Sequence, residues 1–301
     1  MKASVLLNAA AGSVDSDETA QEVARVLAAF RATGSEAVVS AFEPGQLPAA
    51  VQTAARSDTD AVVMGGGDGT LNCGVAVLAG GEKPLGILPL GTLNHFAKDL
   101  GIPMDLDEAV RTVVAGHVRM VDLGEVNGRL FLNNSSLGIY PEVVTKREEI
   151  HERGAGSKWP AMVRAAFDQL RRFPVVTAVL RLPERTVRIT SPLVFVGNNR
   201  YEMKLFAVGR RRELDRGELW LYVARNRSRL GFVGLAARAL FGRLDAAKDF
   251  ESEGLPALEV ASFWRRSIRV ALDGEVMRLS LPLRYRVRPR ALRVLAPPAP
   301  A

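Results

Sequence analysis

Hydrophobic and polar positions divide the first part of the chain, up to Asp122, into alternating blocks. Short apolar runs typical of buried strands alternate with stretches in which apolar residues recur every three or four positions, as on one face of a helix. The expected strands are Ala3–Leu7, Glu36–Phe42, Ala61–Met64 and Leu85–Leu88, and the expected helices are Asp17–Thr33, Leu47–Arg56, Thr70–Leu78 and Leu106–Ala115. This alternation predicts a mainly parallel sheet covered by helices on both faces.

After Asp122 the pattern changes to short strands separated by turns such as Asp273–Gly274. We expect these strands at Arg129–Leu132, Val175–Leu182, Thr186–Ile189, Leu193–Val196, Glu218–Val223, Leu258–Ala261, Ser267–Leu272 and Arg284–Val287. Such a series predicts an antiparallel sandwich or barrel. The fold class is therefore α/β plus all-β. The α/β domain would span residues 1–124, which residues 288–301 could complete, and the β-sandwich domain would span residues 125–287.

Two stretches of the second half have helical periodicity. In Lys158–Arg172 and in Arg229–Leu244, apolar residues recur at helical spacing and basic residues lie largely off that stripe. Basic amphipathic helices can lie in a membrane interface, but most amphipathic helices cover a core with their apolar face, so both interpretations stay open. The arginines within 210–212 and 225–229 are expected to be solvated surface charge.

The charge of the chain is unevenly distributed. The 301 residues are 48% hydrophobic, enough for a sizeable core, and carry a net charge of +7. Residues 1–126 hold 8 Lys+Arg against 16 Asp+Glu, a net −8, and residues 127–301 hold 32 against 17, a net +15. A basic half of this kind indicates a polyanionic partner, either nucleic acid or an anionic membrane surface.

Several classes of protein are excluded by composition. A single cysteine, Cys73, rules out an internal disulfide and a Cys-based zinc site, and the three scattered histidines form no HExxH motif. No run of about 18 apolar residues occurs, so we expect no membrane-spanning helix. The apolar core of the first residues, at about five residues, is too short for a signal peptide, and we expect a cytoplasmic protein.

The sharpest local signal is AVVMGGGDGTLN, residues 61–72, where a buried strand ends in three glycines and Asp68 before a helix begins near Thr70. Glycines let backbone N–H groups approach a phosphate closely, and a helix N-terminus adds a favourable dipole. Because a carboxylate repels phosphate unless a cation intervenes, Asp68 suggests Mg²⁺ bridging to phosphate oxygens. The alternative is a plain glycine-rich turn in which Asp68 caps the next helix. The segment is neither a Walker A nor a GxGxxG motif.

A second strand-to-turn signal is ILPLGTLNHFAKDLGIP, residues 87–103. Thr92 and Asn94 offer a hydroxyl and an amide near the carboxyl end of the strand, which is the edge where open α/β sheets bind ligands. Taken alone, however, this segment favours a simple turn with Asn94 as a helix cap.

Together the two segments are specific. GGDGT followed by PLGTxNxFA closely resembles the diacylglycerol kinase catalytic family, which includes bacterial lipid kinases, sphingosine kinases and ceramide kinases and is remotely related to NAD kinases. The resemblance continues through FLNNSSLGIY (131–140), VGNNRYE (196–202), LDRGELWLYV (214–223) and LDGEV (272–276). It implies an NAD-kinase-like α/β domain, and ATP- and Mg²⁺-dependent phosphorylation of a hydroxyl of diacylglycerol or a similar lipid.

The resemblance also implies site residues. Nucleotide binding would fall on Asn8, Ser40, Gly66, Gly67, Asp68, Gly69, Thr70, Asn72, Thr92 and Asn94. Asp68 would hold Mg²⁺ through the nucleotide, and Asp122 corresponds to an aspartate of the family's metal-and-water network. Glu275 corresponds to the family's general base, which accepts the proton of the lipid hydroxyl. Without the resemblance, Asp273-Gly274-Glu275 predicts a hairpin turn with a solvated glutamate.

Several positions depart from the family's pattern. His95 stands where the family often has an aspartate of the metal-and-water network, and Arg216 stands where many relatives have an aspartate of a structural Mg²⁺ site. Ala9 replaces a proline of the first loop, and Tyr140 replaces a frequent aspartate. His95, Ala9 and Arg216 motivate the alternative of a nucleotide- or lipid-binding homologue without activity. A soluble-substrate kinase of the NAD kinase type is another alternative, although NAD kinases carry a different glycine-rich segment in place of PLGTLN.

The expected partner is a lipid substrate at an anionic membrane surface, reached by peripheral attachment. Nucleic acid is not expected, because the basic half lacks interleaved aromatic residues and recognisable nucleic-acid-binding modules. The chain could also form a homodimer. The identity of the lipid does not follow from the sequence.

Overall fold

The computed structural model describes residues 1–9, 17–43, 45–138, 175–202, 211, 213–225, 228, 231, 234 and 249–298. The predicted helix Lys158–Arg172, and Arg229–Leu244 apart from two isolated residues, lie outside the described residues. The chain divides into two compact units, which are residues 1–123 with 288–301 (unit 1) and residues 124–287 (unit 2). Strands β5 (Val118–Val126) and β16 (Leu283–Leu295) pass from one unit into the other.

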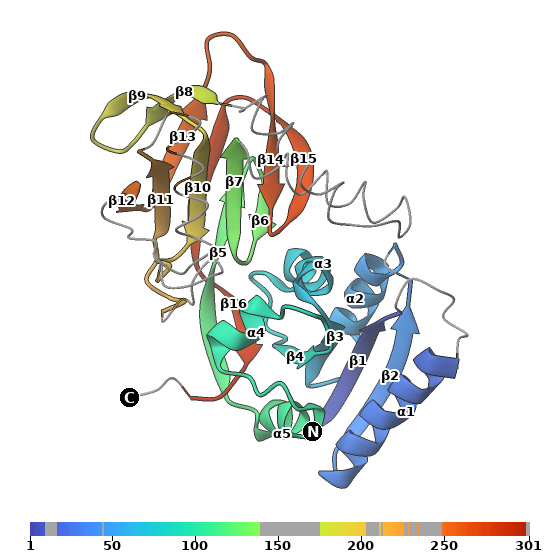
Figure 1. Ribbon diagram of the computed structural model, residues 1–301. Helices are drawn as coiled ribbons and strands as arrows, with labels where there is room; N and C mark the ends of the chain where they lie inside the picture. Colours follow the sequence, from blue (N-terminus) through green and yellow to red (C-terminus); the bar gives the residue numbers. More distant parts are fainter. Residues whose placement is uncertain are drawn as a thin grey trace. The chain divides into compact units, whose positions relative to one another are not determined.

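Unit 1 is built on a parallel sheet in the order β2-β1-β3-β4, with the end of β16 beside β4 (Figure 1). Its other strands and helices are β1 (Lys2–Asn8), α1 (Asp17–Ala32), β2 (Glu36–Phe42), α2 (Leu47–Arg56), β3 (Ala61–Gly66), α3 (Asp68–Leu78), β4 (Leu85–Pro89), α4 (His95–Leu100) and α5 (Leu106–Ala115). Helix α1 contacts α5, and α2 contacts α3, so two pairs of helices pack along the sheet. The expected mainly parallel α/β domain is confirmed.

The central strands of unit 1 are apolar on both faces. Val5, Val62, Val63 and Ile87 are completely buried, as in parallel sheets covered by helices on either side. No helix in the described part of the chain has the length and apolar character needed to span a bilayer.

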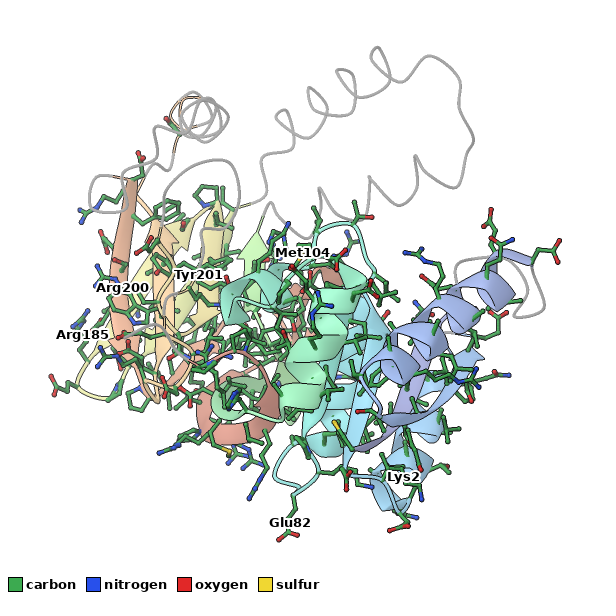
Figure 2. The ribbon with its side chains drawn as sticks, turned by 90° about the horizontal axis from the view of Figure 1, so that it is seen from below. Lys2, Glu82, Met104, Arg185, Arg200 and Tyr201 are labelled. Carbon is green, nitrogen blue, oxygen red and sulfur yellow. The ribbon has the colours of Figure 1, made fainter. Side chains whose placement is uncertain are left out.

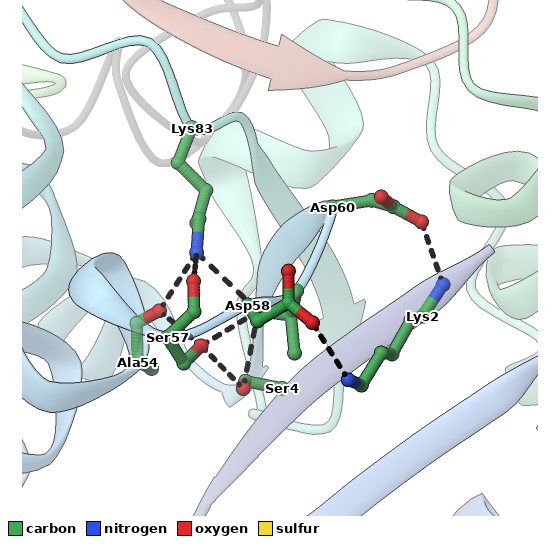
Figure 3. Close-up of polar contacts among 8 residues, drawn as sticks. Lys2, Ser4, Ala54, Ser57, Asp58, Asp60 and Lys83 are labelled. Carbon is green, nitrogen blue, oxygen red and sulfur yellow. Dashed lines mark hydrogen bonds and ion pairs between the residues drawn. The ribbon is translucent and has the colours of Figure 1, made fainter.

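Polar contacts close the amino-terminal edge of this sheet (Figure 3). The Lys83 ammonium donates to the carbonyls of Ala54, at 3.1 Å, in the last turn of α2, and of Ser57, at 2.6 Å, the C-cap residue of that helix. At the start of β1, the backbone N–H of Lys2 donates to Asp60, at 2.7 Å, and the Lys2 ammonium pairs with Asp58. A cation at a helix C-terminus stabilises its exposed carbonyls. These charged groups therefore stabilise the end of α2 and the start of β1.

The strand pairs of unit 2 are antiparallel. One sheet has the order β12-β11-β10-β7-β14-β15, and the other strands pair as β16-β13-β8-β9, with β6 on β5. The strands that belong only to unit 2 are β6 (Arg129–Phe131), β7 (Asn134–Gly138), β8 (Val176–Arg181), β9 (Thr186–Ser191), β10 (Leu193–Asn198), β11 (Leu219–Ala224), β12 (Phe250–Leu255), β13 (Ala257–Ala261), β14 (Ser267–Leu272) and β15 (Glu275–Ser280).

A single apolar cluster joins the two sets of strands in unit 2. Val194 and Leu221 contribute from one sheet, and Leu180 and Val260 contribute from the other. Burial of side chains from two facing sheets defines a β-sandwich. The antiparallel sandwich expected from the sequence is therefore confirmed.

Among the described residues, strands β5, β7 and β12 were not expected from the sequence, and β15 was implied only by the hairpin turn at Asp273-Gly274-Glu275. Strand β7 has the sequence NSSLG, which favours a turn, and β12 has the sequence FESEGL. Both are strands because a neighbouring strand supplies their backbone hydrogen bonds, β10 and β14 for β7 and β11 for β12. Tertiary pairing overrides weak strand propensity at such positions.

Candidate active site

The candidate nucleotide-binding residues of unit 1 lie at the carboxyl ends of adjacent strands. Asn8 ends β1, Gly66 ends β3, and the loop with Thr92 and Asn94 follows β4. In the order β2-β1-β3-β4, the strand that follows β1 in the chain lies on one side of it, and the later strands β3 and β4 lie on the other side. Open α/β sheets bind ligands at such a switch point, which here lies between β1 and β3. Ser40 lies on the neighbouring strand β2, paired with Leu6 of β1.

Asp68 ties the two glycine-containing loops together. One of its carboxylate oxygens accepts the backbone N–H of His95 and the other accepts that of Phe96, both at 3.0 Å. These residues begin α4, so Asp68 caps the N-terminus of α4. The alternative that Asp68 simply caps the next helix in the sequence is wrong, because α3 starts at Asp68 itself with Gly67 as its N-cap.

The two loops touch through their glycines. A Cβ atom on Gly91 would lie 2.7 Å from the backbone nitrogen of Gly67 and 2.8 Å from the side-chain oxygen of Asn94. A Cβ on Gly66 would lie 2.7 Å from the Cβ of Thr70. Real side chains do not approach this closely, so Gly91 is required by the packing of the two loops on each other, and Gly66 by the packing of its own loop against Thr70.

Buried asparagine oxygens surround this edge of the sheet. The amide nitrogen of Asn94 donates to the carbonyls of Pro89, at 3.0 Å, and Gly91, at 2.6 Å, and that of Asn8 donates to the Thr70 hydroxyl, at 3.1 Å. The side-chain oxygens of Asn8, Asn72 and Asn94 are buried, and none has a hydrogen-bond partner in the described part of the chain. Such acceptors are costly to leave unpaired, so a donor from outside the protein would be stabilising here.

The other predicted residues of unit 1 have different environments. Gly69 and Thr92 are exposed. Asn94 occupies the N-cap position of α4 with a left-handed backbone, but its side chain makes no capping bond. Asp122 is 1% exposed and accepts the backbone N–H of Arg290 at 2.7 Å. Over the described ranges, no three His, Cys, Asp or Glu side chains are grouped closely enough to hold a metal ion.

In unit 2, Asp273 and Gly274 form the two-residue turn of the β14–β15 hairpin. Their φ angles are 46° and 94°, and Leu272 pairs with Glu275 across the turn. Two positive φ angles are typical of a type I′ turn, which favours Asp-Gly. The side chain of Glu275 is exposed at the first position of β15.

Asp273 binds the main chain of the segment that leads into β7. Its carboxylate accepts the backbone N–H groups of Leu132, at 2.7 Å, Asn133, at 2.7 Å, and Asn134, at 2.8 Å. Burial raises the pKa of Asp273 to about 6, while these N–H groups and the charge of Arg211 act in the opposite direction. The hairpin that presents Glu275 is thereby fixed to a neighbouring strand.

Arg211 binds the carbonyl side of the same segment. It is only 2% exposed, so the expectation of solvated surface charge is wrong for this residue, while residues 210 and 212 lie outside the described residues. Its guanidinium donates to the carbonyls of Leu132, at 2.7 Å, and Asn198, at 3.0 Å, and to the side-chain oxygen of Asn133, at 2.6 Å. Five N–H groups in a planar fork allow one arginine to satisfy several buried acceptors.

Other segments that carry the resemblance to the family meet at the same place. The Tyr201 hydroxyl donates to the Asn133 carbonyl at 2.9 Å, and its ring lies 5.3 Å from the Arg211 guanidinium. Tyr201 is labelled in Figure 2. The backbone N–H of Arg216 donates to the side chain of Asn199 at 3.2 Å, and the Arg216 guanidinium pairs with Glu213. FLNN, VGNNRYE and LDGEV thus converge on one polar cluster. The paired asparagines between apolar runs were the sequence signal for it.

The chain combines a doubly wound α/β unit, with two glycine-containing loops at one sheet edge, and a β-sandwich unit. The fold is similar to that of the crystal structure of a diacylglycerol kinase from Bacillus anthracis strain Sterne, with a TM-score of 0.69 and 20% sequence identity over 99% of this chain and 97% of that one.

Sequence comparison gives the family. Residues 2–126 match the diacylglycerol kinase catalytic domain. The chain is 32% identical over 285 residues to a Pseudomonas aeruginosa protein named "Probable lipid kinase YegS-like", covering 92% of this chain and 90% of that protein. It is 38% identical over 127 residues to a diacylglycerol kinase of Bacillus subtilis, covering 41% and 42% of the two chains. The chain therefore belongs to the diacylglycerol kinase catalytic family of lipid kinases. The protein is a kinase, and its family implies ATP as the phosphate donor.

Proposed function

We propose that this protein is an ATP- and Mg²⁺-dependent lipid kinase that transfers the γ-phosphate to a hydroxyl of diacylglycerol or a similar lipid. The observation that carries the proposal is the junction of the GGDGT and PLGTLN loops through Asp68 at the switch point of the unit 1 sheet. The names of the relatives support a lipid acceptor.

The nucleotide would bind through Asn8, Ser40, Gly66, Gly67, Asp68, Gly69, Thr70, Asn72, Thr92 and Asn94. The N-terminus of α3 offers backbone N–H groups to the phosphates, as helix N-termini do for many anions. The three unpaired asparagine oxygens are acceptors, so they suit donors such as metal-bound water, ribose hydroxyls or the adenine amino group, and not phosphate oxygens.

The donor set around Asp68 fits Mg²⁺. Proteins commonly hold this ion through one or two carboxylates, water and substrate phosphates, and do not need a closed cage of protein ligands. Asp68 supplies one half-buried carboxylate, and the oxygens of Asn8, Asn72 and Asn94 can accept hydrogen bonds from coordinated water. When bound, Mg²⁺ would neutralise charge that develops on the transferring phosphoryl group. Asp122 remains a weaker candidate for the same network.

Glu275 would act as the general base. Its carboxylate accepts the proton of the lipid hydroxyl while the hydroxyl oxygen forms a bond to the γ-phosphorus, and the bond between that phosphorus and the leaving oxygen of ADP breaks. Asp273 would keep the hairpin in place through its three bonds to the segment at Leu132–Asn134.

A lipid-panel assay with radiolabelled ATP tests this function. Wild type should label at least one lipid with a free hydroxyl, and Glu275→Gln should lose on the order of a hundredfold in rate or more. Glu184→Gln changes another exposed glutamate of unit 2 and is the matched control. Labelling of NAD alone would indicate a soluble-substrate kinase. ATP binding without turnover of any acceptor would indicate an inactive homologue.

We also propose that the protein works as a peripheral protein at an anionic membrane surface in the cytoplasm. The net charge of +15 over residues 127–301 supports attraction to acidic lipids. The protein could also form a homodimer, and light scattering of the purified protein tests its oligomeric state.

A further inference from the structure

One loop of unit 2 exposes two large aromatic side chains side by side. Trp264 is 87% exposed and Phe263 is 72% exposed, the highest values for large apolar side chains in the described part of the chain. The loop, residues 262–266, leads from β13 to β14 and so from one sheet of the sandwich to the other (Figure 1). Adjacent exposed aromatic residues in a soluble domain usually mark a contact surface.

Positive charge surrounds these aromatic residues. Arg265 and Arg266 follow them directly and are exposed, and the guanidinium of Arg188 on β9 lies 5.6 Å from the centre of the Phe263 ring. Between Val260 and Leu272 the chain has three arginines and no acidic residue. The acidic residue just before this stretch, Glu259, is already paired with Arg181 and Arg284. The loop therefore presents two exposed aromatic side chains next to several positively charged ones.

We propose that the loop 262–266 is a membrane-attachment element, which inserts Phe263 and Trp264 into the headgroup region of an anionic bilayer. Trp concentrates at membrane–water interfaces because its ring is apolar and its N–H is polar. Each arginine close to an anionic surface adds attraction, here to lipid phosphates from Arg188, Arg265 and Arg266. Insertion and charge are two separate signals, and stable peripheral binding usually takes two.

A bilayer fits this surface better than a protein partner does. Stable protein interfaces bury a broad patch with an apolar centre, whereas this loop offers two aromatic side chains that arginines surround. A fluid bilayer accepts a small apolar tip without shape complementarity, and its acidic lipids match the surrounding charge.

The loop and the proposed base lie at opposite ends of strand β14. Ser267–Leu272 separates residue 266 from the Asp273–Gly274 turn, and six extended residues span about 20 Å. The loop would therefore hold the protein on the membrane without contacting Glu275. The inference deepens the proposed function, but its test needs neither ATP nor turnover.

The test is sedimentation with vesicles of equal parts phosphatidylglycerol and phosphatidylcholine, in the absence of ATP. The double variant Phe263→Ser/Trp264→Ser should bind about tenfold more weakly or worse, because the apolar signal is lost. Arg266→Gln should bind these vesicles about fivefold more weakly, with no change on pure phosphatidylcholine. Val38→Ser removes another exposed apolar side chain, on β2, and should bind as wild type does.

Three outcomes would overturn the inference. The first is that the double variant binds vesicles as wild type does. The second is that it changes the oligomeric mass of the protein without weakening vesicle binding. The third is that it weakens binding to DNA but not to vesicles. In a kinase assay, the double variant should lose activity on vesicle-embedded lipid and keep it on a dissolved short-chain diacylglycerol. If wild type phosphorylates no lipid, the proposed function fails while the vesicle result still decides the role of the loop.

Discussion

Two carboxylates of the Asp273-Gly274-Glu275 turn have opposite environments although one residue separates them. Glu275 is exposed at the start of β15, whereas Asp273 accepts three backbone N–H groups. The tight turn causes the difference, because it directs the first carboxylate back toward β7 and leaves the second at the hairpin surface. At the residue scale, Asp273 has a structural role, and Glu275 is the exposed carboxylate that we propose as the base.

The first prediction concerns the pH dependence of stability at Asp273. Its pKa is raised from 3.8 to about 6 in the folded protein, so the folded state binds more protons than the unfolded state between these values. Ionisation therefore opposes folding as the pH rises through this interval. Relative to Asp273→Asn, wild type should lose up to about 3 kcal/mol of unfolding free energy between about pH 4 and pH 6, and little more above. Thermal unfolding of both proteins measures it, and parallel curves would contradict it.

The second prediction concerns the buried cation. Arg211→Met should lower the free energy of unfolding by about 3–5 kcal/mol, because the Asn198 carbonyl and the Asn133 side-chain oxygen lose a buried donor and the Asp273 carboxylate loses a nearby positive charge. Arg278→Met, at an exposed position of β15, should change it by about 0.5 kcal/mol or less. Urea unfolding of the two variants compares them. Equal, small effects would mean that water reaches the acceptors.

At the scale of elements, direct contacts hold the loops after β3 and β4 together. Asp68, the first residue of α3, holds the first turn of α4, and Gly67 lies against Gly91. Nucleotide binding and local stability should therefore change together when the contact between the loops is disturbed.

The third prediction tests this coupling with Gly91→Ala. The added Cβ would push the two loops apart at a cost of about 1–3 kcal/mol, since overpacking forces the backbone to move. ATP affinity, measured by calorimetry, should fall along with the melting temperature. Gly45→Ala is the matched control, because a Cβ there has no atom within 4 Å. If Gly91→Ala lowers the melting temperature and leaves the ATP affinity unchanged, the contact between the loops does not contribute to nucleotide binding.

At the scale of the whole molecule, the chain leaves unit 1 through β5 and returns to it through β16. The last part of β16 is buried, with Leu292 and Val294 completely inaccessible, and Val294 pairs with Leu85 of β4. Unit 1 therefore depends on residues from the far end of the sequence.

The fourth prediction follows from this return. Leu292→Ala should destabilise the protein by about 2–5 kcal/mol, the range for truncating a fully buried leucine. Arg293→Ala, at the adjacent exposed position, should change stability by about 0.5 kcal/mol or less. Thermal unfolding distinguishes the two. Similar melting temperatures would show that the end of the chain contributes little to unit 1.

Strong local patterns were sufficient to predict much of unit 1. The helices Leu47–Arg56 and Leu106–Ala115 and the strand Glu36–Phe42 have the bounds expected from periodicity, because each has a continuous apolar face. The GGDGT and PLGTLN segments likewise indicated where the sheet edge would carry polar groups. Strand β7 escaped this reasoning, because pairing partners determine it and periodicity does not. A helix after Asn94 was expected, but its cap was not, because the carboxylate that binds its first N–H groups is that of Asp68 and not the Asn94 side chain.

The sequence by itself determined the order of strands and helices, the glycine loops and the family, since these depend on residues close together along the chain. The tertiary structure alone decided the partners of charged groups. Nothing in the local sequence distinguishes the buried Arg211 from the exposed Arg265, and nothing near Asp273 predicts its bonds to Leu132–Asn134. Burial and long-range hydrogen bonds are properties of packed neighbours, and those neighbours come from segments far apart in the chain.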